Sequence, residues 1–75
     1  MLGVIGARIR QLRRSKGLTE ADLAARVGVS RSFLNAIERG VVRLRVDLMV
    51  RIADALGVSP EDLLKEVPAS TATRP

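Results

Sequence analysis

One short segment, TEADLAARVGVSRSFLNAIERG from Thr19 to Gly40, constrains the fold more than any other part of the chain. Thr19 is a typical helix N-cap, and Asp22 follows three residues later, an arrangement close to a capping box. Gly28 readily adopts the left-handed conformation that ends a helix, and Ser30 can cap a new one. The segment therefore predicts two short helices joined by a tight turn.

Apolar residues at helical spacing give each of these helices one side to bury. Leu23, Ala24 and Val27 form the stripe of the first helix, and Leu34 and Ile37 form that of the second. Two short helices that meet across a glycine-containing turn make a helix-turn-helix motif. The second helix, expected over residues 31–39, then turns small and polar side chains outward, namely Arg31, Ser32, Asn35, Ala36 and Arg39.

Residues on both sides of the motif belong to a longer pattern of apolar, glycine and charged positions, over roughly residues 5 to 65. Its residues are Ile9, Leu12-Arg13, Gly17-Leu18-Thr19, Leu23-Ala24, Gly28-Val29-Ser30, Leu34, Ile37, Glu38-Arg39-Gly40 and Ala53-x-x-Leu56-Gly57-Val58. In these residues the chain resembles the Cro and phage-repressor type of helix-turn-helix domain, also called the XRE family. The resemblance implies an all-α, five-helix, lambda-repressor-like fold. It also implies a DNA-binding transcriptional regulator, which we expect to be a repressor.

Composition excludes several other classes of protein. The 75 residues make one domain, and the absence of Cys and His excludes disulfides, a zinc finger and Cys/His nucleophile or base chemistry. A single Phe is the only aromatic residue, which argues against single-strand binders that stack bases on aromatic side chains. No apolar run is long enough for a signal peptide or a membrane span. We expect a cytoplasmic protein without metal, cofactor or membrane contact.

Charge is unevenly distributed along the chain. Residues 1–45 hold ten basic and three acidic residues, a net charge of +7, whereas residues 46–75 have a net charge of −2. The positive half contains the helix-turn-helix, so a polyanion is the expected partner. The alternatives are a solvated basic surface or, for the basic amphipathic first helix, a membrane surface.

Three more helices complete the expected domain. The apolar spacing of Ile5, Ile9 and Leu12 predicts a helix over residues 4–16, and a second stripe predicts one over residues 46–56. Ser59 and Pro60 then begin a short fifth helix. We expect the domain to span residues 1–67 and the small, polar residues 68–75 to be a disordered tail or the start of a linker.

The second helix of the motif is the expected recognition helix, whose first residues enter the major groove of double-stranded DNA. Arg31 can bond guanine through O6 and N7, although a phosphate contact is the alternative for this residue. Ser32 can donate or accept, Asn35 can read adenine or bind phosphate, and the methyl of Ala36 can touch that of thymine. Phe33 is expected to pack on the core side rather than enter the groove.

Six residues are candidates for contact with DNA phosphates: Thr19, Glu20, Ser30, Arg39, Arg43 and Arg45. Such contacts position a protein without reading sequence. The family usually has Gln where this chain has Glu20, and a carboxylate repels phosphate, so the usual side-chain contact is in question here. Glu20 is a candidate to neutralise a nearby arginine instead.

The resemblance also implies a structural ion pair between Arg13 and Glu38. The pair would join the first helix to the recognition helix, and removal of one buried partner would cost on the order of 3 kcal/mol. Two separate exposed charges are the alternative.

The end of the domain often forms a two-fold contact in this family, and Leu48, Leu64 and Val67 are the residues expected there. A terminal helix that merely closes the core is the alternative. The apolar residues Val41, Val42 and Leu44 either meet a partner chain or pack against the helix over residues 46–56.

We expect a homodimer that reads a two-fold operator with half-sites about one helical turn, roughly 34 Å, apart. The alternative is a protein-interaction module, such as an antitoxin or a transcription coactivator, in which the same fold uses its groove face differently. An enzyme has little support, because the acidic residues occur singly or as surface pairs and no Gly-rich phosphate loop is present.

Overall fold

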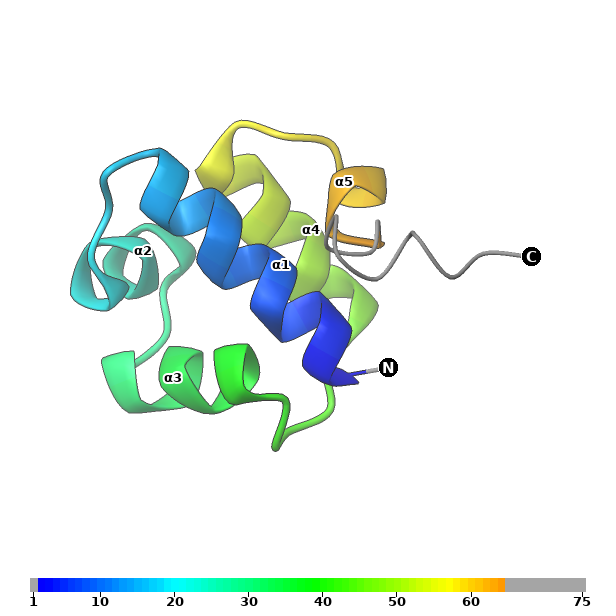
Figure 1. The fold of residues 1–75 in the computed structure, drawn as a ribbon. Helices are drawn as coiled ribbons and strands as arrows, with labels where there is room; N and C mark the ends of the chain where they lie inside the picture. Colours follow the sequence, from blue (N-terminus) through cyan, green and yellow to red (C-terminus); the bar gives the residue numbers. More distant parts are fainter. Residues whose placement is uncertain (1, 65–75) are drawn as a thin grey trace.

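Residues 2–64, which the computed structural model describes, form five helices and no strand, which confirms the expected all-α fold. They are α1 (Leu2–Ser15), α2 (Glu20–Val27), α3 (Arg31–Arg39), α4 (Val46–Leu56) and α5 (Pro60–Leu64) (Figure 1). The bounds of α3 and α4 agree with the expected ranges, whereas α1 begins two residues earlier and ends one residue earlier than expected. The expected tail from Pro68 lies outside the described residues.

The core lies where α1 crosses the other helices. α1 contacts α3, α4 and α5, while α2 contacts α3 and α4 (Figure 1). Every described helix contributes at least one buried apolar side chain to this core. In helices this short, burial of one face provides more stability than intrinsic helix propensity does. The buried side chains are Ile9, Leu23, Ala24, Val27, Leu34, Ile37, Ile52, Ala53, Leu56 and Leu63.

Gly6 allows α1 to pass directly over the end of α3. A Cβ atom at this position would lie only 2.4 Å from the carbonyl oxygen of Ile37 and 2.5 Å from that of Glu38. Those two atoms belong to the α3 backbone and cannot rotate away, so any larger residue would push the helices apart. The sequence analysis did not identify this requirement for glycine.

α4 and α5 complete the bundle, and the N-termini of these two helices are capped differently. Arg45 stands at the N-cap of α4 and makes no capping hydrogen bond with its side chain. At the start of α5, the backbone N–H and the hydroxyl of Ser59 both lie 3.2 Å from Oδ2 of Asp62. Arg8 of α1 donates from Nε to the Asp62 carbonyl oxygen at 3.0 Å, which links the first helix to the last.

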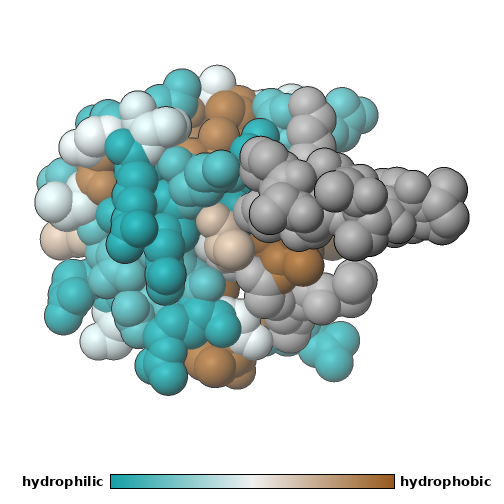
Figure 2. Space-filling model, viewed as in Figure 1, coloured by the Kyte–Doolittle hydropathy of each residue, from teal (hydrophilic) through white to brown (hydrophobic). Residues whose placement is uncertain are grey.

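Most of the surface in the view of Figure 2 is hydrophilic, and apolar atoms appear there in small separate areas. Among the residues whose burial the structure describes, the large apolar ones that remain exposed are Phe33, Val41, Val46, Val50 and Leu64. Within residues 2–64, no helix combines the length and the apolar character that crossing a bilayer requires.

Candidate nucleic-acid interface

Local hydrogen bonds determine where α2 and α3 begin and end. Thr19 and Asp22 form a reciprocal capping box, in which each side chain accepts from the other residue's backbone N–H at 3.0 Å. Gly28 ends α2 in the left-handed conformation, with φ 90°. Ser30 then starts α3 by accepting from the N–H of Phe33 at 3.0 Å. The cap and turn residues thus produce the expected helix-turn-helix.

Arg51 of α4 supports the turn from the other side. Its Nη2 donates to the carbonyl oxygen of Val27, in the last turn of α2, where a cation also interacts favourably with the helix dipole. A Cβ atom on Gly28 would come within 2.9 Å of the same nitrogen. Gly28 is therefore needed for its φ angle, while the end of the Arg51 side chain would have to shift for any larger residue.

α3 buries Leu34 and Ile37 and exposes its N-terminal residues. Arg31 and Ser32 are exposed, while the other two proposed base-reading residues, Asn35 and Ala36, are half-buried. The expectation for Phe33 was wrong, because this residue is 39% exposed and lies outside the core cluster. Phe33 lies about 100° around the helix from Leu34, which places it beside the buried stripe rather than in it.

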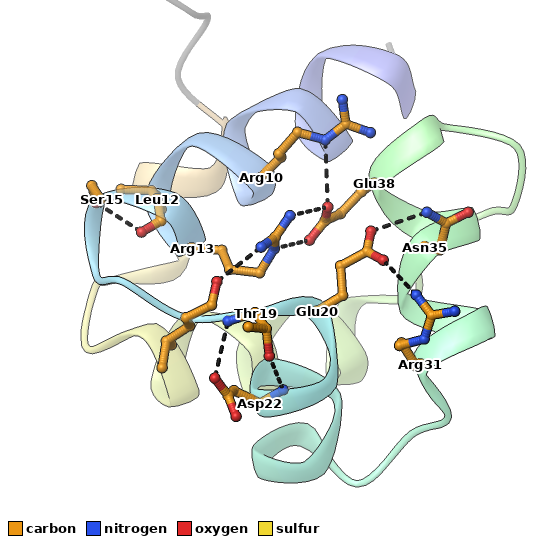
Figure 3. A network of polar contacts seen from close by, with 11 residues as sticks. Arg10, Leu12, Arg13, Ser15, Thr19, Glu20, Asp22, Arg31, Asn35 and Glu38 are labelled. Carbon is orange, nitrogen blue, oxygen red and sulfur yellow. Dashed lines mark hydrogen bonds and ion pairs between the residues drawn. The ribbon is translucent and has the colours of Figure 1, made fainter.

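Glu20, at the start of α2, contacts two of the proposed base-reading residues at once (Figure 3). Its Oε1 accepts from Nη1 of Arg31 at 3.3 Å, and its Oε2 accepts from Nδ2 of Asn35 at 3.0 Å. The Glu20 side chain is 17% exposed, compared with 66% for the Arg31 side chain. Glu20 therefore links the first turn of α2 to the outward face of α3.

The same contacts favour the ionised form of Glu20. The hydrogen bond from Asn35, assisted by the charges of Arg13 and Arg31, lowers the pKa of Glu20 below its ordinary 4.5 against the opposing effect of burial. At neutral pH this side chain is consequently a negatively charged group that can only accept hydrogen bonds.

A second glutamate, Glu38, lies in the interior and binds two arginines of α1 (Figure 3). Arg13 donates to it from Nε at 2.7 Å and from Nη2 at 3.1 Å, and its Nη1 donates to the carbonyl oxygen of Leu18 at 2.8 Å. The hydrogen bonds to Glu38 raise the pKa of Arg13 despite its burial. The structure thus joins α1 to α3 through a buried bidentate pair.

Arg10 adds a weaker contact, at 3.5 Å, between its Nε and Glu38. Together with Arg14 and Arg31 it also lines a hollow of about 570 Å³ between α1, α3 and the start of α2. The sequence analysis did not single out Arg10 and Arg14 as site residues, although their position on the polar side of the α1 stripe was the available signal.

The other proposed phosphate contacts lie at the N-caps of α2 and α3, at the end of α3 and in the loop that follows it. Thr19 and Ser30 use their hydroxyl oxygens as acceptors in the caps, which leaves their O–H groups available to donate. Arg39, Arg43 and Arg45 are exposed. Arg45 lies 3.7 Å from Asp47, and both of these side chains are more than two-thirds exposed.

The loop between α3 and α4 divides its apolar residues. Val42 and Leu44 pack against the core, whereas Val41 is 61% exposed. Of the residues proposed for a two-fold contact, Leu64 is 56% exposed and Leu48 is half-buried against the core. Val67 lies outside the described residues.

Among residues 2–64, no group of three or more His, Cys, Asp or Glu side chains is placed to hold a metal ion.

Comparison with known proteins identifies the family of the chain. Residues 9–63 match the family model HTH_3, described as Helix-turn-helix. An uncharacterized HTH-type transcriptional regulator, y4dJ of Sinorhizobium fredii, is 39% identical over 64 residues, which cover 85% of this chain and 83% of that protein. The regulator SinR of Bacillus subtilis is 36% identical over 64 residues, 84% of this chain but only 58% of SinR.

Solved structures of similar fold include one with DNA. The structure of SinR in complex with DNA superposes with a TM-score of 0.76 at 35% identity, covering 81% of this chain and 98% of that one. The DNA-binding domain of the P22 c2 repressor gives a TM-score of 0.79 at 32% identity, with 83% and 82% covered. Some relatives are far longer. The match to a regulator of Mycobacterium tuberculosis covers 72% of this chain but only 11% of that protein.

Proposed function

Because the chain belongs to the Cro and phage-repressor (XRE) family of helix-turn-helix proteins, whose members here are transcriptional regulators, we propose that it is a sequence-specific DNA-binding repressor. In this proposal α3 lies in the major groove of a two-fold operator, and a homodimer presents two such helices. The protein acts by binding rather than catalysis, in the cytoplasm.

The observation that carries the proposal is the exposure of the first turn of α3. Arg31 and Ser32 project from a helix whose opposite side is anchored in the core by Leu34 and Ile37. Arg31 keeps most of its donors free and can bond O6 and N7 of guanine in the fork geometry that suits it. Ser32, Asn35 and Ala36 would read the neighbouring base pairs, and the exposed ring of Phe33 can contact a thymine methyl.

The positive charge around α3 supports the same proposal. Arg39 at the end of α3, together with Arg43 and Arg45 in the following loop, would bind phosphates on one side of the groove. The hydroxyls of Thr19 and Ser30 would do so on the other side, beside helix N-termini whose backbone N–H groups favour anions. Glu20, occupied by Arg31 and Asn35, is left out of this set.

The two-fold contact would use the surface that α4 and α5 leave open. Of the two described residues proposed for it, Leu64 is exposed and Leu48 lies partly uncovered on α4. A sedimentation experiment tests this part separately from DNA binding. A protein that remains monomeric at high concentration, with or without operator DNA, would refute the homodimer.

A protein-interaction module is the second candidate, favoured by the exposed apolar residues Phe33 on α3 and Val41 just after it. The two functions respond differently to salt. Binding to DNA weakens steeply as salt rises because counterions are released from the phosphates. An apolar contact with a protein partner would lack this dependence.

Selection of bound sites from a random DNA pool tests the main proposal, with Arg31→Ala and Arg31→Lys as variants. Wild-type protein is expected to enrich one motif. Arg31→Ala should abolish the preference at one guanine, worth about 1–3 kcal/mol, with the fold intact. Arg31→Lys keeps the charge but loses the bidentate fork, so it should restore affinity more than preference. Unchanged site ranking in both variants would reduce Arg31 to a phosphate contact.

A further inference from the structure

The orientation of the Asn35 side chain is determined by its partner. The amide of Asn35 has a donor end, Nδ2, and an acceptor end, Oδ1, and only the donor end can face an ionised carboxylate. Nδ2 lies 3.0 Å from Oε2 of Glu20, and Figure 3 shows Oδ1 turned away from this contact. The contact uses one of the two N–H groups of Nδ2 and leaves Oδ1 directed outward.

We propose that Glu20 determines the base preference of Asn35 by holding the amide with its acceptor outward. The inference rests on the proposed function, since it requires α3 in the major groove. An outward Oδ1 needs a donor on the base edge, and the major groove offers such donors only at the N4 amino group of cytosine and the N6 amino group of adenine. The second N–H of Nδ2 stays free beside Oδ1, so adenine, with its N6 donor and N7 acceptor, can satisfy both, and cytosine can satisfy Oδ1. Asn35 should thus favour adenine or cytosine over guanine and thymine, which present only acceptors and would leave Oδ1 facing another acceptor.

Glu20 is a positioning residue in this scheme and does not itself touch the DNA. Its second oxygen holds Arg31 through one of five guanidinium N–H groups, which leaves a free edge for guanine. A side chain held before binding loses less conformational entropy when the complex forms. One carboxylate therefore pre-orients two reading residues, and its negative charge opposes any phosphate that approaches the same place.

Glutamine, the residue that the family usually has here, lacks this directional effect. Its amide can either accept from Nδ2 of Asn35 or donate to Oδ1, so both orientations of Asn35 become available. The Glu20→Gln variant has nearly the same shape as the wild type. It should therefore keep binding DNA while it accepts guanine or thymine at the position that Asn35 reads.

The experiment is selection from a random DNA pool with wild type and four variants, combined with affinities for single-base changes in the selected site. Asn35→Ala identifies the base position that Asn35 reads. At that position wild type should favour cytosine or adenine about tenfold, and Glu20→Gln should reduce the preference to about twofold. Glu20→Ala, which frees the amide without adding a donor, should broaden the preference in the same way.

Asp54→Asn is the matched control, because it removes one negative charge from an exposed side chain of α4 and should leave the preference unchanged. Thermal unfolding and circular dichroism check that each variant is folded. If Glu20→Gln and Glu20→Ala keep the preference that Asn35→Ala abolishes, the inference is overturned. An unaltered motif in Asn35→Ala overturns it as well, while the proposed function stands. If wild type enriches no sequence at all, the proposed function fails first and the inference with it.

Discussion

Glu38 and Glu20 perform similar chemistry in two different regions of this domain. Each glutamate receives hydrogen bonds from an arginine of another helix, and each binds a second group besides. Glu38 is fully buried and its partner Arg13 nearly so, whereas Glu20 is 17% exposed and its partner Arg31 is 66% exposed. Burial, rather than the type of contact, separates the two regions.

The difference has a physical reason. A buried charge that loses its partner cannot be solvated, so the remaining group destabilises the fold. An exposed pair competes with water, and its contribution to stability is small. The pair of Arg13 with Glu38 is therefore suited to fix α1 against α3. The contacts of Glu20 cost little to break, which suits a group that orients side chains for a ligand.

The largest expected effect comes from removal of Glu38. In Glu38→Gln, Arg13 keeps its charge inside the protein but loses its ionised partner. We expect a loss of about 3–5 kcal/mol in the free energy of unfolding, a large part of the stability of a domain of this size. Urea unfolding followed by circular dichroism measures it.

Glu20→Gln is the matched variant on the other side of the comparison. Its free energy of unfolding should change by less than about 1 kcal/mol, because Arg31 is two-thirds exposed and can be solvated without its partner, and the glutamine amide can still accept from Asn35. Equal losses in the two variants would break the comparison, since burial would then have no influence on what each glutamate does.

Acid provides a sharper test of the exposed region. Hydrogen bonds from Asn35 lower the pKa of Glu20, and those from the backbone and side chain of Thr19 lower the pKa of Asp22 below its ordinary 3.8. Both carboxylates thus bind protons more tightly in the unfolded chain than in the folded protein. Their contribution to the free energy of unfolding is therefore fully present at pH values above their ordinary pKa values. It should be lost as the pH falls from about 4.5 through the lower values of the folded state.

Urea midpoints between about pH 7 and about pH 3 measure this loss. Glu20→Gln should flatten the fall, because one of the two groups no longer titrates. A curve that keeps its wild-type slope in the variant would show that the contacts of Glu20 contribute nothing to the pH dependence of folding.

Much of this architecture could be predicted from the sequence because its signals are local. Thr19, Gly28 and Ser30 form caps and turns with residues close by in the chain, so residue type and spacing were sufficient. The partnership of Arg13 and Glu38 joins residues 25 positions apart. It came from the family resemblance, and no periodicity in the chain would have indicated it.

The missed features depend on how the helices cross. Gly6 is required because the backbone of α3 lies against it, and nothing within α1 indicates that approach. The departure from glutamine at Glu20 was visible in the sequence, with an arginine as its expected partner. The simultaneous contact with Arg31 and Asn35 depends on the angle at which α2 meets α3.

The smallest effect is expected from Arg43. This arginine adds a third kind of charge to the comparison, because it is exposed and has no hydrogen-bonding partner among the described residues. Arg43→Ala should leave stability unchanged and weaken binding to all DNA sequences alike, since a phosphate contact reads no base. The slope of log affinity against log salt should flatten by about one unit. Titrations of selected and scrambled sites over a range of salt concentrations measure both quantities. A changed base preference would instead place Arg43 among the reading residues, together with Arg31 and Asn35.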